Sequence, residues 1–237
     1  MFFTNLSGII AYRTLIMYTI TMSKLLLYHG SKSGIVGDIK PISREFCDFG
    51  KGFYMGTDKM QPLTLICNYP SAKLYTMELD LTGLRLLEIE VGIDWALLIA
   101  YYRGKMERVR GSDIYRKYAS LADGYDMVIG KIANDRMFVV LDRFFSGDIT
   151  DTALIGCLSA LNLGQQYVAL TDDACRQIKI ISEESFSETE RGVLRIESEE
   201  YRQKGVTRAD AICRQFRREG RFFDEIIEGV TYGDKNA

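Results

Sequence analysis

The segment LLLYHGSKSGIV, residues 25–36, is decisive for the fold, because a short apolar run ends there in a histidine, a glycine and a serine. The run Leu25–His29 is apolar and closed by Gly30, which is typical of a buried strand. His29 is the only histidine of the chain. An imidazole at a strand end can hydrogen-bond a ligand hydroxyl, and a following glycine lets a ligand approach the backbone. A purely structural histidine is the alternative that this tripeptide leaves open.

A second cluster, DFGKGFYMGTD, spans Asp48–Asp58 and encloses a short aromatic strand between glycines. Two of these glycines flank Lys51, and Tyr54 follows on the strand. A tyrosine ring beside such backbone can stack on a planar ligand, and a cationic ligand adds about 0.5–2 kcal/mol of cation–π attraction. A core tyrosine at a turn is the alternative interpretation.

The rest of the chain predicts an α+β domain followed by a helical extension. At 72–80, apolar and polar side chains alternate, as they do in a half-exposed strand, and 84–89 is expected to continue it. Further strands are predicted at 125–132 and 166–170, and a brief helix at 172–178. Asp94 and Thr150 are expected to cap the helices that begin DWALL and TDTAL.

The two ends of the chain differ from this domain, which we place at 24–182. Residues 1–23 are expected to be an upstream tail of little structural value, with Met22 as a second start. A membrane or secretion segment is the alternative, although Arg13 leaves the apolar stretch short of a bilayer span.

Residues 183–237 are charged and strand-poor, which predicts two or three helices. The segment TRAD, Thr207–Asp210, fits a capping box at the start of one of them. These helices are expected to pack on the domain, to bind a partner or to be partly mobile, with a plain solvated helical face as the alternative.

Composition narrows the class of protein. A net charge of -2 over 237 residues argues against a strongly basic protein that wraps nucleic acid, and the length allows one domain with a substantial core. The five cysteines form no CxxC pair, which indicates reduced thiols in a cytosol, so a cytoplasmic protein is expected. With one histidine, a zinc site is not expected.

Together, the motifs resemble those of the ADP-ribosyltransferase fold, in its diphtheria-toxin and poly(ADP-ribose) polymerase branch, whose signature is His-Tyr-Glu. The closer resemblance is to a bacterial family known as domain of unknown function 3990, DUF3990. The segments that carry it, in chain order, are LYHGS, DFGKGFYMGTD, DWALLIAYYRG, YDMVIGKIAND and GQQYVAL. The resemblance implies a split β-sheet core with peripheral helices.

The same resemblance implies roles for individual residues. His29 would hold a ribose hydroxyl of NAD, the Gly30 backbone would grip the nicotinamide amide, and Ser31 belongs to the same turn. Tyr54 would pack on the nicotinamide ring, which is cationic in NAD. His29 and Tyr54 are therefore expected to form two walls of one slot. The third signature position corresponds to Gln166, where the polymerase branch has glutamate.

That glutamine matters because ADP-ribosyl transfer passes through an oxocarbenium-like state, which a carboxylate stabilises. Glutamine brings no full charge, and losing one such electrostatic partner costs about 10²–10³ in rate. Asp135 is a candidate substitute acid, with a plain turn residue as the alternative. For the pyrophosphate, Arg44 is the first candidate, followed by Lys32 and Lys51, since the chain has no GxGxxG segment.

These assignments predict a mono-ADP-ribosyltransferase-like protein that uses NAD as substrate, releases nicotinamide and modifies an unknown acceptor: a protein, a nucleic acid or a small molecule. One alternative is a pseudoenzyme that binds NAD, ADP-ribose or a protein, with Gln166 marking the lost chemistry. Another is a toxin or effector of the same fold, whose extension 183–237 binds an antitoxin, immunity protein or delivery partner. No membrane contact is expected.

Overall fold

The computed structural model describes residues 24–132, 135–160, 164–216 and 219–229. The predicted tail 1–23, with Met22, lies outside these ranges. The strands are β1 Lys24–Ser31, β2 Phe53–Gly56, β3 Lys73–Asp80, β4 Leu86–Glu88, β5 Met127–Lys131, β6 Gln165–Ala169 and β7 Ile178–Ser185. The helices are α2 Met60–Ile66, α3 Ile93–Tyr102, the 3-10 turn η1 Glu107–Val109, α4 Asp113–Ala119, α5 Asp135–Phe145, α6 Asp151–Ala160, α7 Asp172–Arg176, α8 Glu188–Gln215 and α9 Phe223–Ile227.

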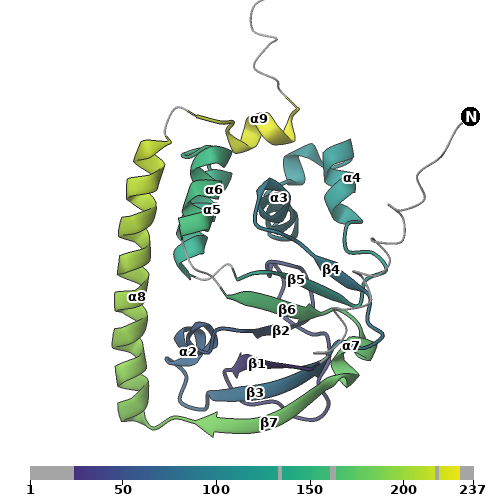
Figure 1. Cartoon of the computed structure of the whole chain (residues 1–237), viewed down its shortest axis with the longest axis vertical. Helices are drawn as coiled ribbons and strands as arrows, with labels where there is room; N and C mark the ends of the chain where they lie inside the picture. The colour runs from purple at the N-terminus through teal and green to yellow at the C-terminus, as the bar shows by residue number, and fades with distance from the viewer. Residues whose placement is uncertain (1–23, 133–134, 161–163, 217–218, 230–237) are drawn as a thin grey trace, which may run out of the picture.

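The described strands form one sheet in the order β4-β5-β6-β2-β1-β3-β7, antiparallel except for β4 and β5 (Figure 1). On one side, β1 pairs with β3 at eight positions. On the other, β1 pairs with β2 only where Tyr28 meets Gly56. We call this single pair, and the divergence of β1 from β2 beyond it, the junction. It joins two parts of the sheet, β4-β5-β6-β2 and β1-β3-β7.

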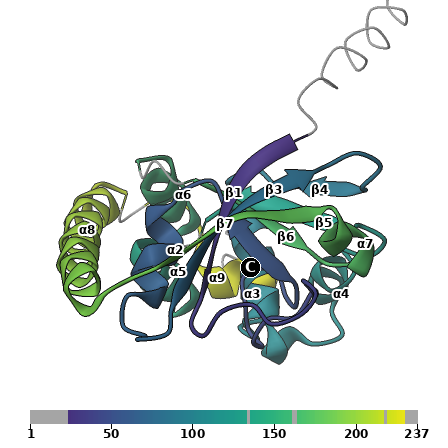
Figure 2. The same cartoon turned by 90° about the horizontal axis from the view of Figure 1, so that it is seen from below.

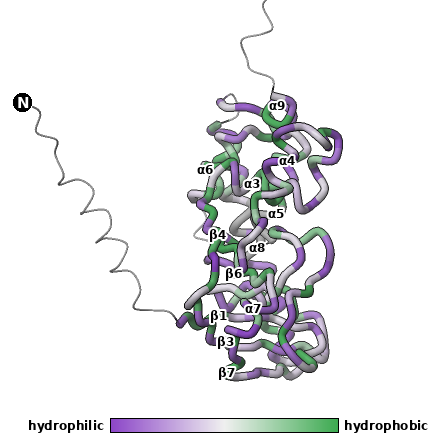
Figure 3. Tube along the Cα trace, turned by 90° about the vertical axis from the view of Figure 1, so that its right-hand side faces the viewer, coloured by the Kyte–Doolittle hydropathy of each residue, from purple (hydrophilic) through white to green (hydrophobic). Residues whose placement is uncertain are grey.

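The two faces of the sheet are covered differently. Residues directly opposite on neighbouring strands share a face, so Tyr28, Gly56, Gln166 and Gly130 lie on one face across four strands. Helix α2 packs on this face beside β1 and β3. Helices α3, α5, α6 and α9 cover it beside β5 and β6, and they lie at the opposite end of the molecule from β3 and β7 (Figures 1 and 3).

The opposite face is covered by α7 and by the loop that follows β1. Its buried side chains come from alternate positions of the strands: Leu27, Phe53, Met55, Tyr75, Met77, Leu79, Met127, Ile129, Tyr167 and Ala169. Ile35 and Ile39 of the loop and Ala174 and Cys175 of α7 pack against them. In Figure 2, α7 lies at the far end of the strands from α8.

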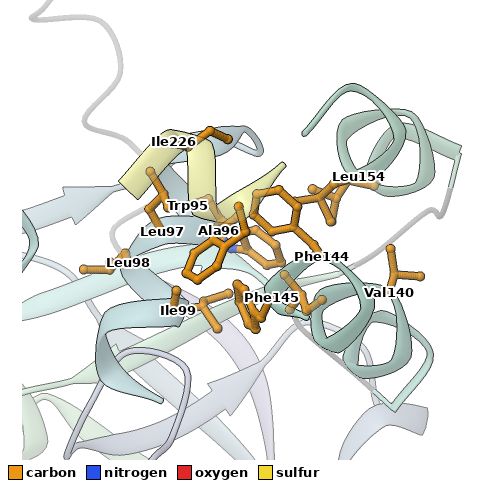
Figure 4. Close-up of a cluster of buried hydrophobic side chains, with 14 of the residues drawn as sticks. Trp95, Ala96, Leu97, Leu98, Ile99, Val140, Phe144, Phe145, Leu154 and Ile226 are labelled. Carbon is orange, nitrogen blue, oxygen red and sulfur yellow. The ribbon is translucent and has the colours of Figure 1, made fainter. Parts of the chain in front are cut away.

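The largest core cluster lies between the helices and β5 and β6. Every residue of α3 from Trp95 to Ala100 is buried, which explains why this helix is apolar on all sides. Figure 4 shows Trp95 surrounded by side chains that include Phe144 of α5, Leu154 of α6 and Ile226 of α9. The indole N–H of Trp95 donates to the Lys131 carbonyl at 3.3 Å, so the helix is tied to the end of β5.

The alternation at 72–80 is confirmed, because Tyr75, Met77 and Leu79 are buried on one face of β3. The prediction that 84–89 continues this strand is wrong. β4 lies at the other edge of the sheet, parallel to β5. The reason is a tertiary contact, since Asp126 accepts hydrogen bonds from both the backbone and the guanidinium of Arg85 and draws the segment to β5.

Of the two predicted helix caps, one is confirmed and the other is wrong. Thr150 does cap α6, accepting from the Ala153 N–H at 3.4 Å. Asp94 does not cap α3, which begins at Ile93. Its carboxylate accepts instead from Lys117, at 2.7 Å, and from the Tyr118 hydroxyl.

The segment after Ser182 is not strand-poor at its start, because the predicted boundary falls inside β7, which pairs with β3. The capping box at Thr207 is also wrong. Thr207 lies inside α8, a helix of 28 residues whose capping box is made by Ser187 and Glu190. The Thr207 hydroxyl donates to the Gln203 carbonyl at 3.1 Å.

The C-terminal helices pack on the rest of the molecule. Helix α8 contacts α2, α5 and α6, as Figures 1 and 2 show, and Ala209, Cys213 and Phe223 belong to the main core cluster. No helix in the described ranges has the length and apolar character needed to cross a membrane. Binding of a partner by 183–237 stays a prediction.

Candidate functional site

The ring of His29 occupies the point where β1 leaves β2. Its Nδ1 lies 2.7 Å from the Tyr54 carbonyl oxygen. A carbonyl can only accept, so Nδ1 carries the proton and donates. The ring also stacks on Phe53, with centroids 4.4 Å apart and planes at 24°. A side-chain hydrogen bond thus replaces the backbone ladder just where the strands separate, and the imidazole is held in one orientation.

The surroundings of His29 determine the protonation state of its imidazole. Burial lowers the pKa of His29 below its ordinary value, and the hydrogen bond to the Tyr54 carbonyl opposes part of that shift. The ring is therefore neutral at pH 7, with its proton on Nδ1 and a lone pair on Nε2. Among the described residues, no hydrogen bond to Nε2 is found. Its lone pair can accept a hydrogen bond from a ligand hydroxyl that reaches it.

A cavity of about 520 Å³ opens at the junction, a size typical of small-molecule sites. The strands contribute one wall, helix α2 a second, and the loop 43–48 a third. The lining residues are Tyr28, His29, Gly30, Ser43, Arg44, Glu45, Phe46, Cys47, Asp48, Tyr54, Met55, Gln61, Pro62, Thr64, Leu65, Arg103 and Gln166. His29 and Tyr54 thus lie in one shared cavity, as the sequence led us to expect.

Tyr54 uses its hydroxyl to hold the preceding loop. The O–H donates to the Gly50 carbonyl at 2.7 Å and the oxygen accepts from the Phe49 N–H at 3.0 Å. Burial raises the pKa of Tyr54 far above its ordinary value, so the phenol stays neutral. Because the hydroxyl is engaged with the backbone, the ring is the part of Tyr54 that remains for a ligand.

Gln166 is buried on β6 between Gly56 of β2 and Gly130 of β5. Its Nε2 donates to the Lys131 carbonyl at 3.3 Å. A carboxylate at this position would place an acceptor oxygen against the Lys131 carbonyl oxygen, which can also only accept. This gives a local reason for glutamine at this position. The amide is thus both a cavity residue and part of the β5–β6 contact.

Gly30 and Gly50 are required by the protein's own packing. A Cβ on Gly30 would lie 2.9 Å from Ile66 and 3.0 Å from the Pro62 carbonyl, so helix α2 already fills that space. Gly50 has a φ of 77°, and a Cβ there would lie 2.6 Å from the Tyr102 ring. Glycine at these positions therefore does not by itself indicate a ligand, although the Gly30 backbone still lines the cavity.

The structure places the three candidate cations in different surroundings. Arg44 lines the cavity, is exposed, and makes no ion pair with any residue in the described ranges. Lys51 is exposed and lies 3.7 Å from Glu45, but it is not a lining residue. Lys32 lies over the Tyr69 ring at 4.4 Å from its centroid. Of the three, Arg44 is placed to meet a ligand.

The structure does not place the two other predicted residues in the cavity. Ser31 ends β1 opposite Lys73 and does not line the cavity. Asp135 begins α5, and its side chain lies outside the described part of the structure. The structure therefore brings together His29, Gly30, Tyr54, Gln166 and Arg44.

An ion pair that the sequence did not reveal supports the loop side of the cavity. Nε of Arg103 lies 3.0 Å from Oδ1 of Asp48, with the two side chains 6% and 14% exposed. Both residues stand in motifs that resemble the family, yet 55 positions separate them, so no local pattern pairs them. The signal available was a charged residue at the end of the otherwise apolar helix DWALLIAYYRG.

Fold and cavity together define an α+β protein with a ligand-sized cavity at a gap in its sheet. Comparison with known families then matches residues 25–180 to DUF3990, a protein family of unknown function, and the chain belongs to this family. Comparison with curated proteins gave no match, and comparison with solved structures gave none either. In the described ranges, no group of three or more histidine, cysteine, aspartate or glutamate side chains is arranged to hold a metal ion.

Proposed function

We propose that this protein binds NAD in the cavity at the junction and acts as a mono-ADP-ribosyltransferase. The observation that carries the proposal is one cavity lined by His29, whose imidazole is neutral, by Tyr54 and by the buried amide residue Gln166. These groups match what the two halves of nicotinamide riboside offer: hydroxyls on the ribose, and a flat cationic ring. A cytoplasmic location accompanies the proposal, since all five cysteines are free.

In the proposed complex, His29 Nε2 accepts a hydrogen bond from a ribose hydroxyl. The Gly30 backbone pairs with the carboxamide, and the Tyr54 ring faces the pyridinium, whose positive charge it attracts. The bond between the nicotinamide nitrogen and ribose C1′ then breaks, and nicotinamide leaves with the electron pair. A nucleophile of the acceptor bonds to C1′ and releases its proton to solvent.

The proposed reaction is slow, because Gln166 contributes no charge to the oxocarbenium-like state. Glu45 and Asp48 are the carboxylates among the described lining residues, and Asp48 is bound by Arg103. We therefore expect a rate about 10²–10³ below that of an enzyme with a carboxylate in the third position.

The test is to incubate the purified chain with cell lysate and NAD labelled in its adenylate phosphate. Labelled acceptor and free nicotinamide should both appear, and both should be lost in His29→Ala and Tyr54→Ala. Val193→Ala, an exposed position on α8, is the matched control and should behave as wild type. If both label transfer and nicotinamide release were absent with NAD in excess, this result would contradict transferase activity.

A second candidate, a protein that binds NAD or ADP-ribose without turnover, is favoured by one observation. The Gln166 amide donates to the Lys131 carbonyl, so the third position is built for an uncharged side chain. Calorimetry that detects NAD binding while nicotinamide release is absent would favour this candidate. Gain of NAD hydrolysis in Gln166→Glu would show a site that lacks only its charge.

A further inference from the structure

The loop 43–48 is fixed at both ends and open in its middle. At its start, the Ser43 hydroxyl accepts from the Gly52 N–H at 3.4 Å. At its end, Asp48 is bound by the buried guanidinium of Arg103. Arg44, Glu45 and Phe46 between them are exposed and line the cavity. The chain thus supports this short tip rigidly against the cavity mouth.

Phe46, in the middle of that tip, has two unfavourable features. Its φ is 60°, and it is the one non-glycine residue with positive φ in the part of the chain that the structure describes. A bulky residue is a rare occupant of this region, and such backbones cluster at ligand clamps. Its side chain is also 67% exposed, although it lines the cavity. A glycine or polar residue would avoid both costs in a loop that only connects two elements.

The ring of Phe46 also has a defined position. A Cβ added to Gly104 would lie 3.5 Å from the Phe46 ring, so the ring rests beside the turn that follows α3. That turn also carries Arg103, which holds the loop through Asp48. An aromatic ring supported in this way, with most of its surface in solvent, has the form of a platform for a flat ligand group.

We propose that Phe46 is a specificity-determining residue whose ring stacks on the adenine base of the dinucleotide, with the neighbouring Arg44 meeting the pyrophosphate. This rests on the proposed function. The buried Gln166 and the partly buried His29 line the part of the cavity where the proposed cleavage of the bond to nicotinamide takes place. The other end of NAD then reaches the exposed rim, where the Phe46 ring lies two residues from Arg44, a cation with no ion pair to the residues that the structure describes.

The experiment compares three probes by calorimetry: NAD, ADP-ribose and nicotinamide mononucleotide, which lacks the adenosine. Phe46→Ala should weaken binding of NAD and ADP-ribose by about 10-fold or more, as expected for loss of one base-stacking contact, and should leave the mononucleotide within about twofold. Phe46→Gly should give the same result, because glycine tolerates the positive φ and only the ring is lost. Phe46→Tyr, which keeps the ring, should restore binding.

Ile42→Ala is the matched control, since Ile42 is exposed just before the same loop but does not line the cavity. It should bind all three probes as wild type does. An equal loss for the mononucleotide in Phe46→Ala, or no loss for any probe, would overturn the adenine assignment while leaving the proposed function standing. Absence of binding of all three probes to the wild-type chain would overturn both.

Discussion

Strand β1 has two edges that are bonded in different ways. Toward β3 it makes a ladder of eight residue pairs, and toward β2 it makes one. At the sparse edge, the His29 imidazole donates to the Tyr54 carbonyl in place of the missing backbone pairs. The dense edge lies against helix α2 and a buried cluster of apolar side chains, while the sparse edge faces the cavity.

The difference shows how a sheet accommodates an opening. Regular pairing would close β1 against β2 and leave no room for a ligand, whereas complete separation would leave buried carbonyls without donors. One imidazole satisfies the carbonyl and keeps the gap. We therefore expect changes at the β3 edge to affect stability most, and changes at the β2 edge to affect stability less and ligand binding more.

The largest effect on stability is expected at the dense edge. Leu74 of β3 is fully buried opposite Gly30, and Leu74→Ala should lower the free energy of unfolding by about 3–5 kcal/mol through the cavity it leaves. Denaturant unfolding measures this. Leu26→Ala, at a 62% exposed position on β1, is the control and should cost less than about 0.5 kcal/mol. Similar losses for both variants would show that burial of Leu74 does not determine the size of the loss.

A smaller loss of stability is expected at His29. His29→Ala removes the donor to the Tyr54 carbonyl and the stacking on Phe53, which together should cost about 2–3 kcal/mol. His29→Asn places an amide N–H near Nδ1 and should recover at least half of that loss, yet it lacks Nε2 and should still not bind NAD. If asparagine restored binding as well, Nε2 would have no part in the site.

Tyr54→Phe tests the loop without removing the ring. Loss of the hydroxyl leaves the Phe49 N–H without its acceptor, so we expect a cost of about 1–2 kcal/mol. Amide hydrogen exchange should become faster in residues 43–52 and stay unchanged in β3. Unchanged exchange in the loop would mean that Ser43 and Arg103 hold it without Tyr54.

The smallest effect is a pH dependence of stability. The pKa of His29 is lowered by burial, so below pH 6.5 the unfolded chain takes up a proton before the folded one does. The contribution of His29 to stability is thus full above pH 6.5 and is lost as the pH falls from there toward the lowered pKa. As the chain has no other histidine, unfolding measured between pH 5 and 6.5 should show a steeper slope in wild type than in His29→Asn. Equal slopes would mean that the imidazole is not desolvated.

Much of the fold could be read from local patterns. Strands β1, β2, β3, β5 and β6 and the helices α3, α6 and α7 all fall in segments predicted from apolar periodicity and turn residues, and Thr150 caps α6 as predicted. Two of the errors have one cause in common. The position of β4 and the partners of Asp94 depend on residues far away in the chain. Thr207 instead lies inside a continuous helix whose cap is made at Ser187.

The candidate site, like the fold, could be predicted only in part. The motifs pointed to His29, Gly30, Tyr54 and Gln166, and the fold places these in one cavity with Arg44. The sequence alone determined which residues end each strand and what chemistry they bring. It could do so because these features depend on a few neighbouring positions. Only the tertiary structure decided that β1 and β2 pair once and then separate, and that Arg103 holds the loop bearing Phe46, because such contacts join segments with no common periodicity.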